Sequence, residues 1–105
     1  MVTDKIIDEV KKRLVDKFHP DQIILFGSQA RGTANKHSDV DILVICPVKG
    51  SRRALTLDMY RALEGLGIAK DIVVLTKEEF ERNRRISGTI ARPAWLEGRV
   101  LYENA

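Results

Sequence analysis

Residues 23–46, IILFGSQARGTANKHSDVDILVIC, decide the fold of this chain. They place two apolar runs, residues 23–26 and 42–46, on either side of a polar segment that contains glycine. Apolar runs of this length, bounded by glycine and polar residues, are typical of buried strands. We expect the second strand to span residues 39–46. Both of its faces are apolar after Asp41, which favours a central strand covered on both sides.

Amphipathic patterns predict helices before and after this stretch. Thr3 can cap the first helix, and Pro20 ends it because proline disfavours helical geometry in the residue before it. Ser51 can cap the second helix. Apolar residues recur along one face of each helix, namely Ile6, Val10, Leu14 and Phe18 in the first, and Leu55, Met59, Leu63 and Leu66 in the second.

The remaining third of the chain predicts one more buried strand and shorter elements. Residues 71–75 form an apolar, β-branched run, and Thr76 with Glu79 makes a capping box that starts a helix around Phe80. Residues 94–97 are expected to be helical, and residues 100–102 to form a final strand. The helix between the second and third strands makes a right-handed crossover, so these strands are parallel and the first is antiparallel to the second. The sequence thus predicts an α/β domain with a mixed sheet and flanking helices.

Length and composition favour one domain over residues 1–105. The hydrophobic fraction of 44% and the charged fraction of 31% are those of an ordinary globular protein. No apolar run reaches the length of a membrane span, and the N-terminal residues do not resemble a signal peptide, so we expect a cytoplasmic protein with no membrane partner. Cys46 is the only cysteine, which excludes an internal disulfide; its apolar surroundings predict an inert core residue.

The formal net charge of +3 is modest, but basic residues cluster at Arg52-Arg53 and between Arg82 and Arg92. Such a stretch can attract nucleotides, nucleic acid or an acidic protein, or it can be part of a solvated surface of mixed charge. The modest overall charge does not favour direct binding of nucleic acid.

Three aspartates are predicted to meet at one edge of the sheet. Asp39 and Asp41 alternate with Val40, so they project from the same face about 7 Å apart at the backbone. Asp71 begins the parallel neighbouring strand. Carboxylates this close raise one another's pKa unless a cation is present, and hard oxygen ligands suit Mg²⁺ or Mn²⁺. Two such ions about 4 Å apart would stabilise an in-line displacement at phosphorus.

The turn after the first strand supplies a second half of this site. Gly27 lets the backbone approach a ligand, and Ser28 offers a hydroxyl and an N–H group. If residues 28–31 begin a short helix, their free N–H groups form an anion site to which Arg31 can add charge. Ser38 either caps the entrance of the second strand or contacts phosphate.

Structural alternatives exist for the same residues. Asp39 can cap a strand, Asp41 can be half of a surface ion pair, and Lys70 can neutralise Asp71 without any metal ion.

Residues 25–44, LFGSQARGTANKHSDVDILV, resemble the signature of the DNA polymerase beta-like nucleotidyltransferase superfamily. That signature is Gly-Ser, ten residues, and Asp-x-Asp, which here are Gly27-Ser28 and Asp39-Val40-Asp41. Asp71 is similar to the third carboxylate of the family. The chain length and the ending at residues 97–103, EGRVLYE, look like the minimal nucleotidyltransferases, many of which are antitoxins paired with HEPN-domain toxins.

The resemblance implies a role for each residue. Gly27 and Ser28 would bind the nucleoside triphosphate, Asp39 and Asp41 would hold Mg²⁺ (or Mn²⁺), and Asp71 would be a metal ligand or activate the acceptor hydroxyl. It further implies transfer of AMP from ATP to a toxin, although nothing in the residues names the base, the acceptor or the stoichiometry.

Two functions remain open at this point. One is an active transferase whose acceptor surface comes from a HEPN-type toxin, another helical protein or a homo- or hetero-oligomer. The other is a binding module that inhibits a partner by contact alone. The complete carboxylate set favours the transferase.

Overall fold

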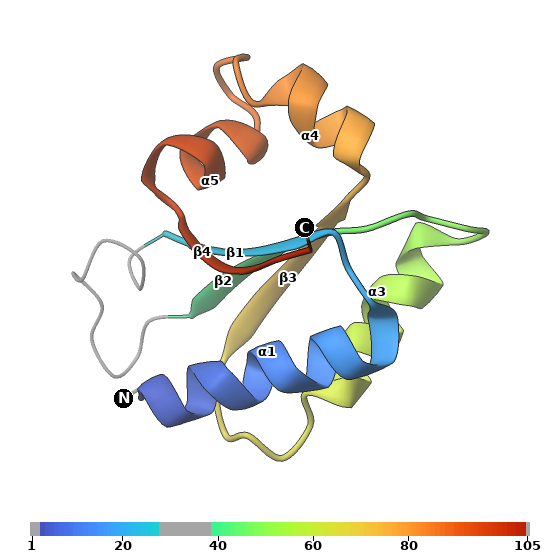
Figure 1. Cartoon of the computed structure of the whole chain (residues 1–105), viewed down its shortest axis with the longest axis vertical. Coiled ribbons are helices and arrows are strands. Elements are labelled where there is room, and N and C mark those ends of the chain that lie inside the picture. Colours follow the sequence, from blue (N-terminus) through green and yellow to red (C-terminus); the bar gives the residue numbers. More distant parts are fainter. Residues whose placement is uncertain (1–2, 28–38, 105) are drawn as a thin grey trace.

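The computed structural model describes residues 3–27 and 39–104 and shows a four-stranded sheet between two layers of helices (Figure 1). The strand order is β3-β2-β1-β4. The elements in chain order are α1 (Asp4–Phe18), β1 (Gln22–Phe26), β2 (Val40–Ile45), α3 (Arg52–Ala62), β3 (Lys70–Leu75), α4 (Lys77–Asn83), α5 (Ala91–Glu97) and β4 (Arg99–Glu103).

The sheet has the mixed topology that the sequence predicts. Strands β2 and β3 are parallel and in register from Val40 opposite Lys70 to Ile45 opposite Leu75. Strand β1 is antiparallel to both β2 and β4. The α/β class, the mixed sheet and the flanking helices are therefore confirmed.

The central strand β2 is covered on both faces, because its residues alternate between two apolar clusters. On one face Val40, Ile42 and Val44 pack with buried residues of α1 and α3. On the other face Leu43 and Ile45 pack with α4 and α5. Figure 1 shows these helix pairs on opposite sides of the sheet. The two apolar faces require burial on both sides, since an exposed face of this kind loses the hydrophobic stabilisation.

The predicted caps are present at the starts of three helices. The backbone N–H of Ile6 donates to the Thr3 hydroxyl over 3.3 Å, and that of Ala54 donates to the Ser51 hydroxyl over 3.1 Å. Thr76 and Glu79 form the reciprocal capping box at α4. These bonds satisfy N–H groups that have no partner inside a helix.

Three helix details differ from the sequence prediction. Ile7, not Ile6, is the buried residue in the first turns of α1. Helix α3 ends at Ala62, before Leu66. Helix α5 begins at Ala91, three residues earlier than expected, because Pro93 lies in its first turn, where a missing N–H breaks no hydrogen bond.

Side chains of α3 close the outer edge of β3. The Ile72 N–H donates to the Tyr60 hydroxyl over 2.9 Å, and Arg52 donates to the Val74 carbonyl over 3.3 Å. Arg52 also pairs with Glu79 of α4 at 2.8 Å and so links the helices of both layers. Within residues 3–27 and 39–104, no helix combines the length and the apolar character that crossing a bilayer requires.

Candidate active site

The centre of the candidate site is the carboxylate of Asp41, which lies against the backbone of Gly27. Strands β1 and β2 pair so that Phe26 is opposite Asp41, and Gly27 follows directly at a φ of +76°. A Cβ atom at residue 27 would overlap Asp41 Oδ2 and lie 3.2 Å from Asp41 Cγ. Two features therefore favour glycine here: the left-handed backbone, and the Asp41 carboxylate, which would have to shift to make room for a side chain.

Asp71 is the second carboxylate at this place. In the parallel ladder it is directly opposite Asp41, so the two backbones are about 4.8 Å apart. Asp41 alternates with Leu43, and Asp71 with Val73, both of which pack on the side of α4 and α5. The two carboxylates thus project from the same face of the sheet, beyond the end of that apolar cluster.

Lys70 does not neutralise Asp71. It alternates with Asp71 along β3 and therefore lies on the opposite face of the strand, the same face as Ile72 and Val74, which pack toward α1 and α3. Its ammonium group is 3.5 Å from the Ile68 carbonyl oxygen. Within the described residues Asp71 forms no ion pair, so the structural alternative based on Lys70 has no support.

Asp39 lies one residue before the start of β2 and is exposed, whereas Asp41 is half-buried. Among residues 3–27 and 39–104, no three His, Cys, Asp or Glu side chains are grouped so that they could hold a metal ion by themselves. The roles of Asp39, Asp41 and Asp71 in metal binding stay predictions.

Three further predicted residues, Ser28, Arg31 and Ser38, lie outside the described residues. Their assigned contacts with phosphate also stay predictions.

The register between β1 and β2 is the part of the site that sequence reasoning missed. Spacing alone indicates that Gly27 and Asp41 are near each other, but not that the carboxylate lies on the glycine. The signal in the sequence is Gly27 directly after the first apolar run, together with Asp39 and Asp41 directly before the second. Cys46 is buried, as expected, and burial together with the charge of Asp21 raises the pKa of its thiol.

The geometry can hold one end of a phosphate chain or a divalent ion beside a backbone turn. Asp41 and Asp71 are neighbouring acceptors at the rim of a buried sheet, and the absence of a side chain at Gly27 lets the Asp41 carboxylate lie against the turn. This arrangement suits phosphoryl chemistry, in which positioning and charge neutralisation carry most of the catalysis.

Comparisons with known proteins agree with this geometry. The model of the family described as "Nucleotidyltransferase domain" matches residues 7–99. This chain belongs to that family, which makes it a nucleotidyltransferase. A relative from Methanocaldococcus jannaschii, named "Putative protein adenylyltransferase MJ0604", is 34% identical over 105 residues, which cover 97% of this chain and all of the relative.

Solved structures show the same fold. A toxin–antitoxin crystallised with AMP-PNP has a TM-score of 0.68 at 23% identity, over 92% of this chain and 73% of its own. A mutant of the toxin–antitoxin MntA–HpeT has a TM-score of 0.62 at 21% identity, over 99% of this chain and 75% of its own. At these identities the likeness establishes the fold, and the family expected from residues 25–44 is confirmed.

Proposed function

We propose that this chain transfers a nucleoside monophosphate, AMP from ATP, to a hydroxyl group of a partner protein, in a reaction that depends on Mg²⁺ or Mn²⁺. The observation that carries the proposal is that Asp41 and Asp71 are opposite each other in the parallel ladder, with the Asp41 carboxylate against the backbone of Gly27. Membership of the nucleotidyltransferase family and the similarity to a named protein adenylyltransferase support it.

The donor set fits a magnesium ion that shares its coordination with the substrate. Magnesium is commonly bound by one or two carboxylates together with substrate phosphates and water, rather than by an all-protein cage. Asp41 and Asp71 would supply these carboxylates, with Asp39 as a further ligand. When bound, the ion would neutralise charge on the phosphates and make the α-phosphorus more electrophilic.

The remaining chemistry belongs to the residues of the chain. Gly27 lets the Asp41 carboxylate lie against the turn, where it would meet the triphosphate. An acceptor hydroxyl oxygen forms a bond to the α-phosphorus while the bond from that phosphorus to the α,β-bridging oxygen breaks and pyrophosphate leaves. Asp71 is exposed at the rim of the site, and we assign it the task of accepting the hydroxyl proton.

A toxin is the acceptor that we propose. The two structural neighbours described above are toxin–antitoxin proteins, one of them with a nucleotide analogue. The partner in this proposal is a HEPN-type toxin or another helical protein encoded beside this chain, which gains an adenylyl group. Contact inhibition without transfer is the competing outcome.

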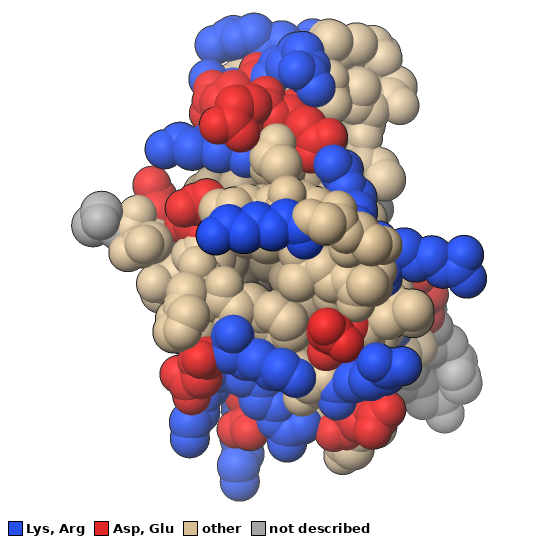
Figure 2. All heavy atoms as spheres, turned by 90° about the vertical axis from the view of Figure 1, so that its right-hand side faces the viewer, with Lys and Arg blue, Asp and Glu red and all other residues tan. Residues whose placement is uncertain are grey.

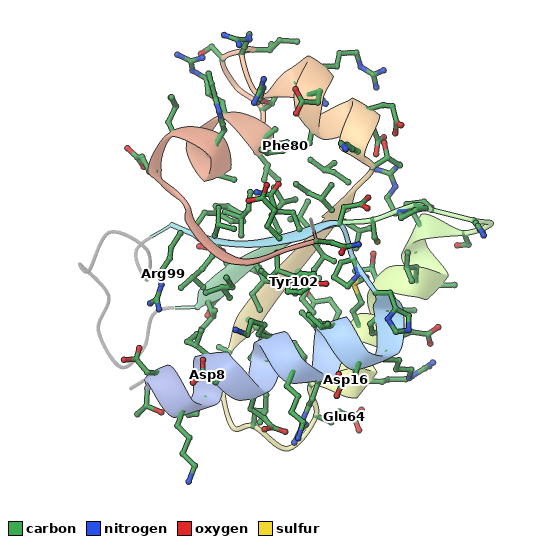
Figure 3. All side chains as sticks on the ribbon, in the orientation of Figure 1. Asp8, Asp16, Glu64, Phe80, Arg99 and Tyr102 are labelled. Atoms are coloured by element: carbon green, nitrogen blue, oxygen red, sulfur yellow. The ribbon has the colours of Figure 1, made fainter. Side chains whose placement is uncertain are left out.

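The test is co-expression of the chain with the product of the adjacent gene, followed by intact-mass spectrometry of that product. An added adenylyl group is expected with the wild-type chain and not with Asp41→Asn. Asp16→Asn is the matched control, because Asp16 is an exposed aspartate on α1, on the other side of the sheet (Figure 3). A stable complex in which the product keeps its mass with the wild-type chain would favour contact inhibition and refute the transfer.

A further inference from the structure

The segment from Arg82 to Arg92 concentrates the positive charge of the chain. It contains four arginines and no acidic residue, so the rest of the chain, with the total at +3, has a formal charge of −1. Arg84 pairs with Glu81 at 2.9 Å. Within the described residues, Arg82, Arg85 and Arg92 form no ion pair, which leaves three cations for an external partner.

Exposed apolar side chains lie among these arginines. Ile86, Ile90 and Leu96 have 50%, 47% and 57% of their surface exposed, and three such side chains near one another are more informative than a single exposed one. Arg92 and Leu96 are four residues apart on α5, opposite the buried Ala91 and Ala94, so they share its outer face. We call Arg85, Ile86, Ile90, Arg92 and Leu96 the α4–α5 surface.

This surface is held in one shape by internal bonds. The Thr89 hydroxyl is 2.8 Å from the Asn83 carbonyl oxygen and 2.9 Å from that of Ile86. Arg92 donates to the Arg85 carbonyl over 3.2 Å. A binding surface that is already ordered loses little conformational entropy when a partner docks.

The position of the surface relates it to the site. Helices α4 and α5 pack on the face of the sheet from which Asp41 and Asp71 project. In Figure 1, α5 lies above the end of the sheet where the described part of β1 stops and β2 starts. A protein held there is therefore on the catalytic face.

We infer that the α4–α5 surface docks the protein acceptor, and that the acceptor presents an acidic patch with an apolar centre to it. This inference rests on the proposed function, because it names the surface that would hold the acceptor. Carboxylates of the partner pair with Arg85 and Arg92, and its apolar side chains cover Ile86, Ile90 and Leu96. Apolar anchors with arginines around them are the usual composition of protein interfaces.

The same observations disfavour nucleic acid as the partner. Single-stranded nucleic acid binds by stacking bases on aromatic rings, but the Trp95 ring is already contacted by the guanidinium groups of Arg84 and Arg85, at 5.0 and 5.1 Å from its centroid. Acidic residues are also close by. Figure 2 shows Asp and Glu side chains beside Lys and Arg at the upper end of the molecule, so the charge there is mixed and not the continuous basic groove that tracks a phosphate backbone.

The experiment measures affinity of the purified chain for the adjacent-gene product by calorimetry. Ile90→Asp and Arg85→Glu should each weaken the complex by about tenfold or more. The matched controls are Leu57→Asp and Arg53→Glu on α3, at the other face of the sheet, where Leu57 is 46% exposed. The controls should bind like the wild-type chain. ATP titration in parallel should show unchanged nucleotide binding in all four variants.

Four results would overturn the inference. The first is no complex between the wild-type chain and the adjacent-gene product, and the second is equal affinity of Ile90→Asp and Leu57→Asp for that product. The third is that the wild-type chain binds a labelled single-stranded RNA, and that Ile90→Asp and Arg85→Glu lose the RNA but not the protein. The fourth is self-association of the wild-type chain that Ile90→Asp and Arg85→Glu abolish. The proposed function fails separately. If the wild-type chain does not bind ATP, but Ile90→Asp and Arg85→Glu still lose affinity for the adjacent-gene product, the proposed transfer is refuted and the proposed docking surface is not.

Discussion

Replacement of Gly27 by alanine tests the contact between the turn and Asp41. Two effects are expected, and a second glycine separates them. Gly27 has a φ of +76° and Gly50 a φ of +77°, so an alanine at either position has the same backbone strain. A Cβ at residue 50 meets nothing within 4 Å, whereas one at residue 27 overlaps the Asp41 carboxylate.

The magnitudes follow from these distances. The left-handed backbone costs an L-residue about 1–2 kcal/mol, and each kcal/mol lowers Tm by roughly 4–8 °C in a domain of this size. Gly50→Ala should show this loss alone. In Gly27→Ala the carboxylate of Asp41 must also move by about 1 Å to restore an ordinary contact, and a displacement of that size at a reacting centre costs about 100-fold in rate.

The assay is adenylyl transfer per folded molecule, measured well below the melting temperature of both variants. Gly50→Ala should keep the wild-type rate, and Gly27→Ala should fall by about two orders of magnitude. If the two variants are equally active, the position of the Asp41 carboxylate does not matter for the reaction, and the site as described here is wrong.

Two further predictions concern charged residues outside that contact. The pKa of Glu79 is lowered from 4.5 to about 2, first by the hydrogen bond from Arg52, so the stabilisation from its carboxylate is complete above pH 4.5 and is lost as the pH falls toward 2. Urea melts should show Glu79→Gln less stable than the wild type above pH 4.5, with a difference that closes by about pH 2. A difference that stays constant with pH would contradict this assignment. Lys70→Gln should leave ATP affinity unchanged in titration calorimetry, because Lys70 faces α1 and α3, and a large loss would return this residue to the site.

Periodicity and caps were sufficient to predict most of the fold. The alternation of Val40, Ile42 and Val44 with Leu43 and Ile45 identified a strand buried on two sides, and its parallel partner followed from the connecting helix. Such patterns work because side chains alternate between the two faces of a strand, so the local sequence shows which faces are apolar and must be covered.

The details that depend on contacts between distant segments could not be predicted. The contact of Asp41 with Gly27 requires the register of Phe26 opposite Asp41, which an eleven-residue connection allows but does not impose. The contact of Arg84 and Arg85 with Trp95 likewise depends on how α5 packs over the sheet. Charge density indicated the segment from Arg82 to Arg92, but only the structure shows which side chains are exposed there.

The central claim is that Asp41 and Asp71, at the Gly27 turn, bind a nucleoside triphosphate together with a divalent cation. Titration calorimetry of the wild-type chain with ATP, first in Mg²⁺ and then in excess chelator, tests it most directly. Carboxylates without a cation repel triphosphate, so measurable binding is expected in Mg²⁺ and a large loss in chelator, with Asp41→Asn weak in both and Asp16→Asn like the wild type. Equal ATP affinity with and without the cation would contradict the claim.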